Sequence, residues 1–246
     1  MLLEKIRNRL LRIKFFNEIY YYLFDVINFL KIIISKRFIL KRLRVSIKIH
    51  EKFDIYSSLI PAHQRKNEFC DFINYANRHP ISTIVEIGTA DSGTHLLLSE
   101  LIYSSKTIVA IDLEIRNRIS MSAINTYNDS RVVIKGSSHS HETYSKLKMV
   151  LGGHKIDLLF IDGDHTYSGV KKDFEIYKKL VSPKGIVVFH DIVPDNFSRT
   201  GVKTSSYVGD VPKFWNEIKD QFKYVEFKDT NDQDGCGIGV ISFDQD

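Results

Sequence analysis

The chain has 246 residues, of which 43% are hydrophobic and 26% are charged. This composition excludes fibrous, mucin-like and wholly disordered proteins, and the length suits one large α/β domain with an appendage. Cys70 and Cys236 are too few for a disulfide framework. This favours a reducing, cytoplasmic location, or the fold simply makes no use of disulfides.

The positive charge is concentrated at the N-terminus. Residues 1–48 hold twelve Lys or Arg against three Asp or Glu, a net charge of +9, whereas the remaining chain has a net charge of −4. A protein that binds nucleic acid through its main domain would place basic residues there, so we expect no nucleic-acid partner.

Residues 1–48 are predicted to form a basic amphipathic helical appendage. Apolar residues recur at three- and four-residue steps, with basic residues between them: Leu3, Ile6, Leu10 and Ile13. Asp25, Asn28 and Lys31 interrupt the apolar stretch that follows, so neither a transmembrane span nor a signal peptide is expected. Two interpretations stay open. The appendage packs on the main domain or on a second subunit of a homo-oligomer, or it attaches peripherally to the anionic inner face of a membrane.

Residues 49–246 alternate between short apolar runs and amphipathic stretches. The five predicted strands are Thr83–Ile87, Thr107–Ile111, Arg131–Ile134, Ile156–Ile161 and Gly185–Phe189. Predicted helices lie around Phe69–Ala76, Gly93–Tyr103, Arg116–Tyr127, His141–Leu151, Tyr167–Leu180 and Val211–Phe222. This order predicts a doubly wound, mostly parallel α/β sheet. Lys223–Phe227 and Gly237–Phe243 have no helix between them, so they are expected to pair antiparallel at one edge of a seven-stranded sheet.

Polar residues follow the first three predicted strands, where ligands bind in open parallel sheets. The first strand leads into Glu86, Gly88 and Thr89, but the glycine spacing does not match a dinucleotide-binding loop. Asp112 ends the second strand and can accept both hydroxyl groups of a ribose, or cap the next helix. Ser137 and Ser138 follow the third strand and either border an adenine or form an ordinary turn.

The fourth and fifth strands lead into a denser set of reactive side chains. These are Asp162, Asp164, His165, His190 and Asp191. Because both strands end at the same edge of the sheet, carboxylates and imidazoles are expected to meet there. Such a set suits a divalent-cation site, an acid–base site, or both.

Together these motifs resemble class I S-adenosylmethionine-dependent methyltransferases, and more closely the cephalosporin hydroxylase-like and macrocin-type O-methyltransferase branch. The resemblance covers about residues 60–243. It rests on Val85–Thr89, Ile111-Asp112, Ile161–Tyr167 and Phe189–Ile192, of which the third is the most specific.

The resemblance implies a set of site residues. Glu86, Gly88 and Thr89 would lie at the methionine part of S-adenosylmethionine, Asp112 at its ribose, and Ser137 or Ser138 at its adenine. Asp162 and Asp191 match the magnesium ligands of metal-dependent relatives, and His190 occupies a third ligand position. The implied ion is Mg²⁺ or Mn²⁺. Imidazole is a softer ligand than carboxylate, so Mn²⁺ or a similar ion is expected to tolerate His190 better than Mg²⁺ does. Many relatives have glycine where this chain has Ser92, which leaves the local cofactor contacts open.

The resemblance implies an O-methyltransferase in which His165 or Asp164 takes a proton from the acceptor hydroxyl. The favoured acceptor is a sugar hydroxyl in a polysaccharide or glycolipid precursor, because a basic, apolar N-terminus suits work beside a membrane. The alternatives are methylation of a small secondary metabolite and a non-catalytic, membrane-associated binding protein on the same fold.

Overall fold

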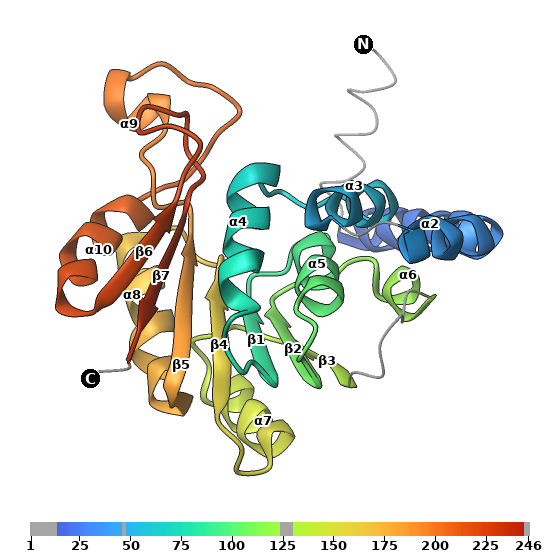
Figure 1. Ribbon diagram of the computed structural model, residues 1–246, viewed down its shortest axis with the longest axis horizontal. Helices are drawn as coiled ribbons and strands as arrows, with labels where there is room; N and C mark the ends of the chain where they lie inside the picture. Colours follow the sequence, from blue (N-terminus) through green and yellow to red (C-terminus); the bar gives the residue numbers. More distant parts are fainter. Residues whose placement is uncertain (1–13, 46–47, 124–129, 244–246) are drawn as a thin grey trace.

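The computed structural model describes residues 14–45, 48–123 and 130–243. Within them, seven strands form one sheet in the order β3-β2-β1-β4-β5-β7-β6 (Figure 1). The strands are β1 (Thr83–Ile87), β2 (Thr107–Asp112), β3 (Ser130–Lys135), β4 (Ile156–Ile161), β5 (Val181–His190), β6 (Lys223–Phe227) and β7 (Ile238–Ser242). β1 to β5 pair parallel, whereas β7 pairs antiparallel with both β5 and β6. The predicted doubly wound, mostly parallel sheet is confirmed.

Helices cover both faces of this sheet. They are α2 (Lys14–Val45), α3 (Ile49–Leu59), α4 (Lys66–Ala76), α5 (Gly93–Leu101), α6 (Arg118–Ala123), α7 (His141–Leu151), α8 (Tyr167–Tyr177), α9 (Asn196–Thr200) and α10 (Val211–Ile218). α3, α4 and α5 share one apolar core with the sheet, and α7, α8 and α10 share the other. The predictions for residues 1–13 and for 124–127 lie outside the described residues.

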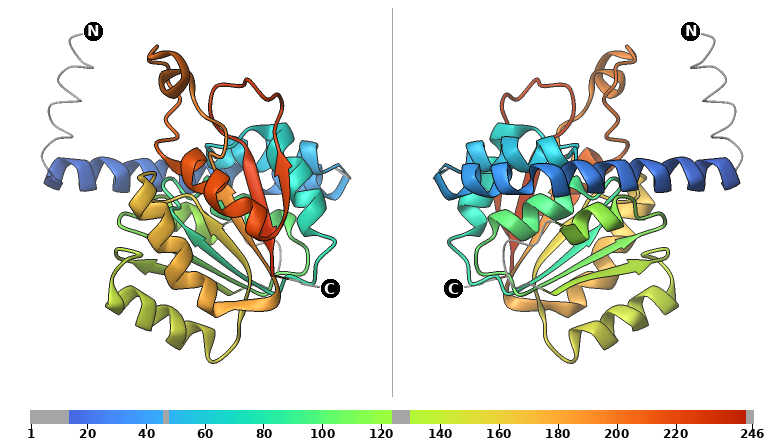
Figure 2. Two further views of the ribbon diagram at one scale, coloured as in Figure 1. Left: turned by 90° about the vertical axis from the view of Figure 1, so that its left-hand side faces the viewer. Right: turned by 90° about the vertical axis from the view of Figure 1, so that its right-hand side faces the viewer.

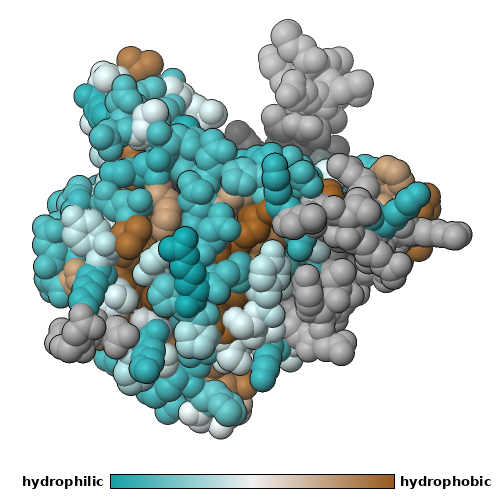
Figure 3. All heavy atoms as spheres, viewed as in Figure 1, coloured by the Kyte–Doolittle hydropathy of each residue, from teal (hydrophilic) through white to brown (hydrophobic). Residues whose placement is uncertain are grey.

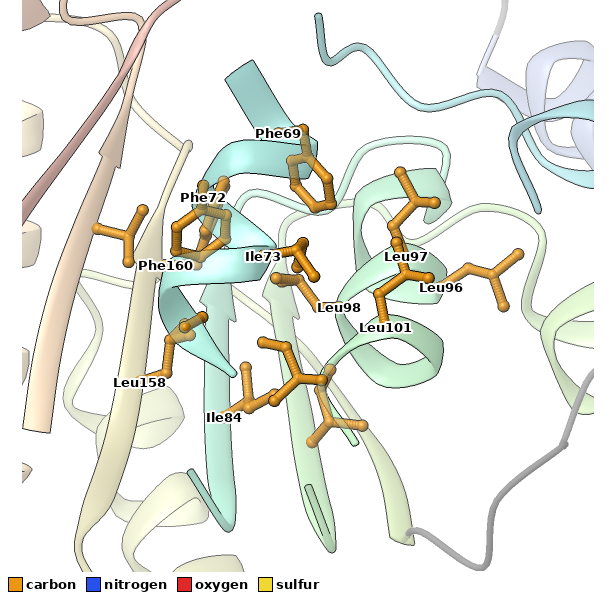
Figure 4. Close-up of a cluster of buried hydrophobic side chains, with 14 of the residues drawn as sticks. Phe69, Phe72, Ile73, Ile84, Leu96, Leu97, Leu98, Leu101, Leu158 and Phe160 are labelled. Atoms are coloured by element: carbon orange, nitrogen blue, oxygen red, sulfur yellow. The ribbon is translucent and has the colours of Figure 1, made fainter. Parts of the chain in front are cut away.

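The two cores follow from the alternation of side chains along the strands. In β1, Ile84 packs beside α4 and α5, while Val85 and Ile87 pack beside α7 and α8. Figure 4 shows the first core, where Phe72 of α4 meets Phe160 of β4, with ring centroids 6.0 Å apart. Because the central strands β1, β2, β4 and β5 are buried on both faces and mostly apolar, most of the reactive side chains that meet a ligand lie at their carboxyl ends.

β5 begins earlier than the sequence indicated. Val181 pairs with Ile156, and after a break in register Ile186 pairs with Leu158. Pro183, Lys184 and Gly185 are typical of a turn before a strand that starts at Gly185. In the structure they form an irregular stretch within β5, because β4 offers a pairing partner on both sides of them.

α2 is a 32-residue helix that lies along the outside of the sheet domain. Figure 2 shows it as a straight rod that passes α5 and α6, with its N-terminal end projecting beyond the rest of the molecule. No helix in the described parts of the chain is both long and apolar enough to cross a membrane.

Candidate active site

The polar residues expected at the strand ends do meet in one place. A cavity of about 700 Å³ opens at the carboxyl ends of β1 to β5. Of the predicted site residues, ten line it: Gly88, Thr89, Asp112, Ser137, Ser138, Asp162, Asp164, His165, His190 and Asp191. Its volume lies in the range of small-molecule sites.

The turn between β1 and α5 forms one wall of this cavity, and its backbone geometry requires glycine at one position. Gly88 has a φ of +82°, and a Cβ there would lie 2.0 Å from the carbonyl oxygen of Asp162. The close approach of β1 and β4 therefore leaves no room for any side chain.

Ser92 occupies the position where many relatives have glycine, and it adopts the conformation that glycine favours. Its φ is +68°, and its buried hydroxyl donates a hydrogen bond of 2.6 Å to the carbonyl oxygen of Arg116. Gly93 begins α5 against Pro61, whose carbonyl oxygen would lie 2.0 Å from an added Cβ. The hydrogen bond of the serine hydroxyl thus stabilises the turn, although the positive φ of Ser92 strains the backbone.

Asp112 braces the same turn. Its Oδ2 accepts hydrogen bonds from the backbone amides of Thr89 and Ala90, at 2.7 and 2.9 Å, and its Oδ1 accepts one from Glu114. The carboxylate therefore joins the ends of β1 and β2. It also lines the cavity, where it could accept hydrogen bonds from ribose hydroxyl groups.

Glu86 is the one predicted site residue that lies apart from the others. It is fully buried, does not line the cavity, and has its Oε2 2.9 Å from Nδ1 of His95 on α5. Alternation along β1 turns its side chain toward α5, and burial raises the pKa of its carboxyl group. A contact between its side chain and a cofactor stays a prediction; the pair fixes α5 against β1.

Ser137 and Ser138 lie opposite α8. The carbonyl oxygen of Ser138 accepts a hydrogen bond of 2.7 Å from the hydroxyl of Tyr177, and Ser137 Oγ accepts one from the amide of His139. Nε2 of His139 lies 3.1 Å from Asp173, a fully buried carboxyl group whose pKa is raised by burial. These contacts hold the β3–α7 loop at the cavity wall.

The acidic and imidazole side chains after β4 and β5 form one compact cluster. Nδ1 of His190 lies 3.2 Å from Asp162 Oδ1 and 3.5 Å from Asp191 Oδ1. The ring of His165 lies between the same two carboxylates, with Nε2 3.4 Å from Asp162 and Nδ1 3.4 Å from Asp191. Four reactive groups from two strands therefore surround one point, as the sequence indicated.

The electrostatics of this cluster are those of closely paired opposite charges. Burial would lower the pKa of His190, but Asp162 and Asp191 raise it well above its usual range. Burial would raise the pKa of Asp162, but His190 and His165 hold it below its usual range. Asp191 also has a φ of +64°, a strained conformation that is concentrated at functional sites.

Asp164 lines the cavity and also has a local structural task. Its Oδ1 accepts a hydrogen bond of 2.9 Å from the amide of Thr166, and Thr166 in turn caps α8 through the amide of Gly169. A role for Asp164 as a base stays a prediction.

Comparisons with known proteins agree with this geometry. A family model described as "Methyltransferase domain" matches residues 85–192, the segment from β1 to the end of β5 that carries the predicted site residues. Over this segment the chain is similar to methyltransferases. Two solved structures share its fold: an O-methyltransferase from Bacillus cereus in complex with SAH, and a putative caffeoyl-CoA O-methyltransferase from Staphylococcus aureus. The first is 18% identical with a TM-score of 0.53, over 81% of this chain and 94% of the other. The second is 19% identical with a TM-score of 0.51, over 85% and 100%.

Curated relatives match parts of this chain. Uncharacterized protein R132 of Acanthamoeba polyphaga mimivirus is 33% identical over 115 residues, which make up 44% of this chain and 51% of that protein. Uncharacterized protein y4gI of Sinorhizobium fredii is 50% identical over 36 residues, 15% of this chain and 4% of that protein. The chain spans about half the length of the first relative.

Two residues in or beside the cavity, Gln64 and Cys236, were missed by sequence reasoning. Gln64, before α4, donates a hydrogen bond of 3.3 Å to Asp162 Oδ2, and Cys236, from the β6–β7 loop, lines the cavity. Tyr207 stacks on His165, with the ring centroids 5.8 Å apart. Gln64 and Cys236 come from loops far from the strand-end motifs and had no local signal. Tyr207 was foreseeable, because it lies in the segment of residues 194–214, whose lack of helical or strand periodicity allows either a substrate loop or a solvated connection.

The potential metal ligands in the cluster fit a divalent ion that accepts nitrogen and sulfur ligands as well as oxygen. Asp162, His165 and Asp191 form one set with converging ligand atoms, and His190, Asp191 and Cys236 form a second. Among the described residues, Nε2 of His190 has no hydrogen-bond partner although the ring is buried. Mixed carboxylate, imidazole and thiol donors favour Mn²⁺ or another first-row transition ion over Mg²⁺.

Proposed function

We propose that this chain is an S-adenosylmethionine-dependent O-methyltransferase whose acceptor is a hydroxyl group of a sugar in a polysaccharide or glycolipid precursor. The observation that carries the proposal is that one cavity is lined both by the braced turn of Gly88 and Asp112 and by the carboxylate–imidazole cluster. The fold shared with O-methyltransferases supports the reaction class.

The first half of the cavity would hold the cofactor. S-adenosylmethionine, when bound, supplies a methyl group on a positively charged sulfur. The glycine turn allows its backbone to approach the cofactor closely, and Asp112 is placed to bind ribose hydroxyls. The small residues Gly136, Ser137 and Ser138 leave space for the adenine of the cofactor.

The second half would prepare the acceptor. A divalent ion held by Asp162, Asp191 and His190 would lower the pKa of an acceptor hydroxyl. His165 lies against both carboxylates and lines the cavity, which supports the proposal that it would accept the proton from that hydroxyl. Positioning both substrates in one cavity supplies the rest of the rate enhancement.

The mouth of the cavity supports a sugar acceptor. Tyr207 is 71% exposed, its ring is stacked on His165, and the neighbouring Ser205 and Ser206 also line the cavity. An aromatic face beside hydroxyl groups can contact both the C–H and the O–H groups of a sugar ring.

Two measurements test the proposal. Calorimetry should detect S-adenosylmethionine binding to the wild-type chain, whereas a non-catalytic scaffold need not bind it. Mass spectrometry of glycans from cells with and without the gene should then show one sugar lighter by one methylene group when the gene is absent. If the cofactor binds but no glycan changes, a small secondary metabolite becomes the favoured acceptor. If the cofactor does not bind, the methyltransferase proposal fails.

A further inference from the structure

We propose that the outer face of α2 binds an anionic lipid surface. The inference concerns a surface of the appendage and stands independently of the proposed reaction. It starts from how α2 is attached to the domain.

A few specific polar contacts fix which face of α2 points inward. Asp25, 6% exposed, accepts hydrogen bonds from the backbone amides of Ile119 and Ser120 in the first turn of α6, at 2.9 and 2.8 Å. One turn along, Asn28 donates to Asn117, and Ile32 joins the buried core. Tyr21 lies under the guanidinium group of Arg116, 4.0 Å from the ring centroid. The rotation of α2 about its axis is therefore set by the domain itself.

The opposite face of α2 is apolar and uncovered. Leu23, Ile27, Leu30 and Ile34 follow each other at four-, three- and four-residue steps, so they form one strip, and they are 54%, 50%, 50% and 83% exposed. Further exposed apolar side chains flank this strip: Ile19, Tyr20, Tyr22, Phe24, Ile33 and Phe38. Figure 3 shows hydrophobic surface at the right-hand end of the molecule, where α2 lies in Figure 1. An exposed apolar face of this kind marks an interaction site.

The charges around this strip select its partner. Residues 1–14 carry five basic groups and one acidic group, and residues 36–48 carry six basic groups and no acidic group. Basic residues thus lie before and after the apolar strip, and Asp25 is turned inward. An apolar strip with cationic ends suits a helix that lies flat in the headgroup region of an anionic membrane.

The same distribution disfavours a second copy of α2 as the partner. In a parallel pair the basic N-terminal segments would meet each other, and so would the basic C-terminal segments. In an antiparallel pair each basic N-terminal segment would meet a basic C-terminal segment. Both arrangements place like charges together, whereas anionic lipids neutralise both ends at once.

Co-sedimentation of the full chain with vesicles tests the proposal. The wild-type chain should bind vesicles of phosphatidylcholine with phosphatidylglycerol, and should bind vesicles of phosphatidylcholine alone much more weakly. Replacing Leu23, Ile27 and Ile34 together by Ser should weaken binding at least about tenfold, because three large apolar side chains no longer enter the lipid. Raising the salt concentration should also weaken it.

A matched variant and the oligomeric state complete the experiment. Met149 and Val202 are 73% and 61% exposed on other surfaces, so replacing both by Ser should leave lipid binding unchanged. Thermal unfolding of both variants should match the wild type, since the altered side chains are exposed. The proposal is overturned if the triple variant binds as well as the wild type. It is equally overturned if the wild type does not bind anionic vesicles but forms a dimer that the triple variant does not form.

Discussion

The two halves of the cavity are built on different principles. On the side of β1, β2 and β3, the wall includes much backbone and several small side chains. Its carboxylates are already engaged: Asp112 binds three backbone amides, and Asp91 pairs with His63 and Arg116. On the side of β4 and β5, two carboxylates and two imidazoles are crowded together, and Nε2 of His190 has no partner among the described residues.

The first half of the cavity thus provides a surface of fixed shape, and the second half provides the reactive side chains. The first half is complete without a ligand and offers a preformed surface to a cofactor. The second half holds charged groups whose hydrogen-bonding and ligating capacity is only partly used, which is costly unless a ligand completes it. Changes in the first half should therefore act through folding and cofactor affinity, and changes in the second through catalysis and ion preference.

The largest effect is expected from Gly88→Ala. The new Cβ would lie 2.0 Å from the Asp162 carbonyl oxygen, so β1 and β4 must separate, and the free energy of unfolding should fall by about 3 kcal/mol or more. Denaturant unfolding measures the loss, and calorimetry should show that cofactor affinity is lost with it. Gly201→Ala is the matched control, because Gly201 has a φ of +75° but open space around it, and it should cost only about 1 kcal/mol. Equal costs for both variants would show that the close approach of the strands does not matter.

Asp162→Asn should act on catalysis. The substitution removes the negative charge that pairs with His190 and His165, so kcat should fall at least about a hundredfold while S-adenosylmethionine affinity changes little. Asp157→Asn is the control at the other end of β4, where the carboxylate accepts hydrogen bonds from the amides of Ser82 and Thr83. This control should lose about 1 kcal/mol of stability and keep its kcat. Full turnover by Asp162→Asn would remove the cluster from the reaction.

His190→Glu should change the preferred ion. A carboxylate in place of the imidazole makes the ligands harder, so affinity for Mg²⁺ relative to Mn²⁺ or Co²⁺ should rise about tenfold. Titration calorimetry with each ion measures the ratio without any assay of activity. His63→Glu supplies the control, because His63 lines the same cavity but pairs with Asp91 outside the cluster. An unchanged ratio in His190→Glu would mean that His190 is not a ligand.

The smallest effect concerns the two cysteines. Burial raises the pKa of the Cys70 thiol to about 12, whereas Cys236 is half-buried and lines the cavity. Iodoacetamide should therefore modify Cys236 at least about tenfold faster than Cys70 in the native protein. Mass mapping identifies the labelled site, and bound Mn²⁺ should slow the reaction. Labelling of Cys70 at an equal rate would contradict the burial of the α4 core.

Much of the architecture was readable from the chain. The boundaries of β1, β4, β6 and α7 agree with the predicted ones, because each is a continuous apolar or amphipathic run with a clear break at both ends. The start of β5 was wrong, since a local proline and glycine suggested a turn while pairing with β4 extended the strand. Local signals thus failed where a neighbouring strand decided the outcome.

The site shows the same division. Asp162, His165, His190 and Asp191 were foreseeable as neighbours, because parallel strands must deliver their carboxyl ends to one edge of the sheet. The orientation of Glu86 was not foreseeable. Its neighbours in the sequence do not show that its side chain pairs with His95, on the helix that packs against that face of the sheet.

The sequence alone determined the order of the elements, the polar motifs at the strand ends and the charge asymmetry of the appendage, because these depend on periodicity, motif and composition. Only the tertiary structure decided which groups share the cavity. Cys236 and Tyr207 reach it from distant loops, and Gln64 donates a hydrogen bond to Asp162 from another loop. Asp25 turns the apolar strip of α2 outward by capping a helix almost a hundred residues away. Such contacts depend on how elements pack in space, which no local pattern encodes.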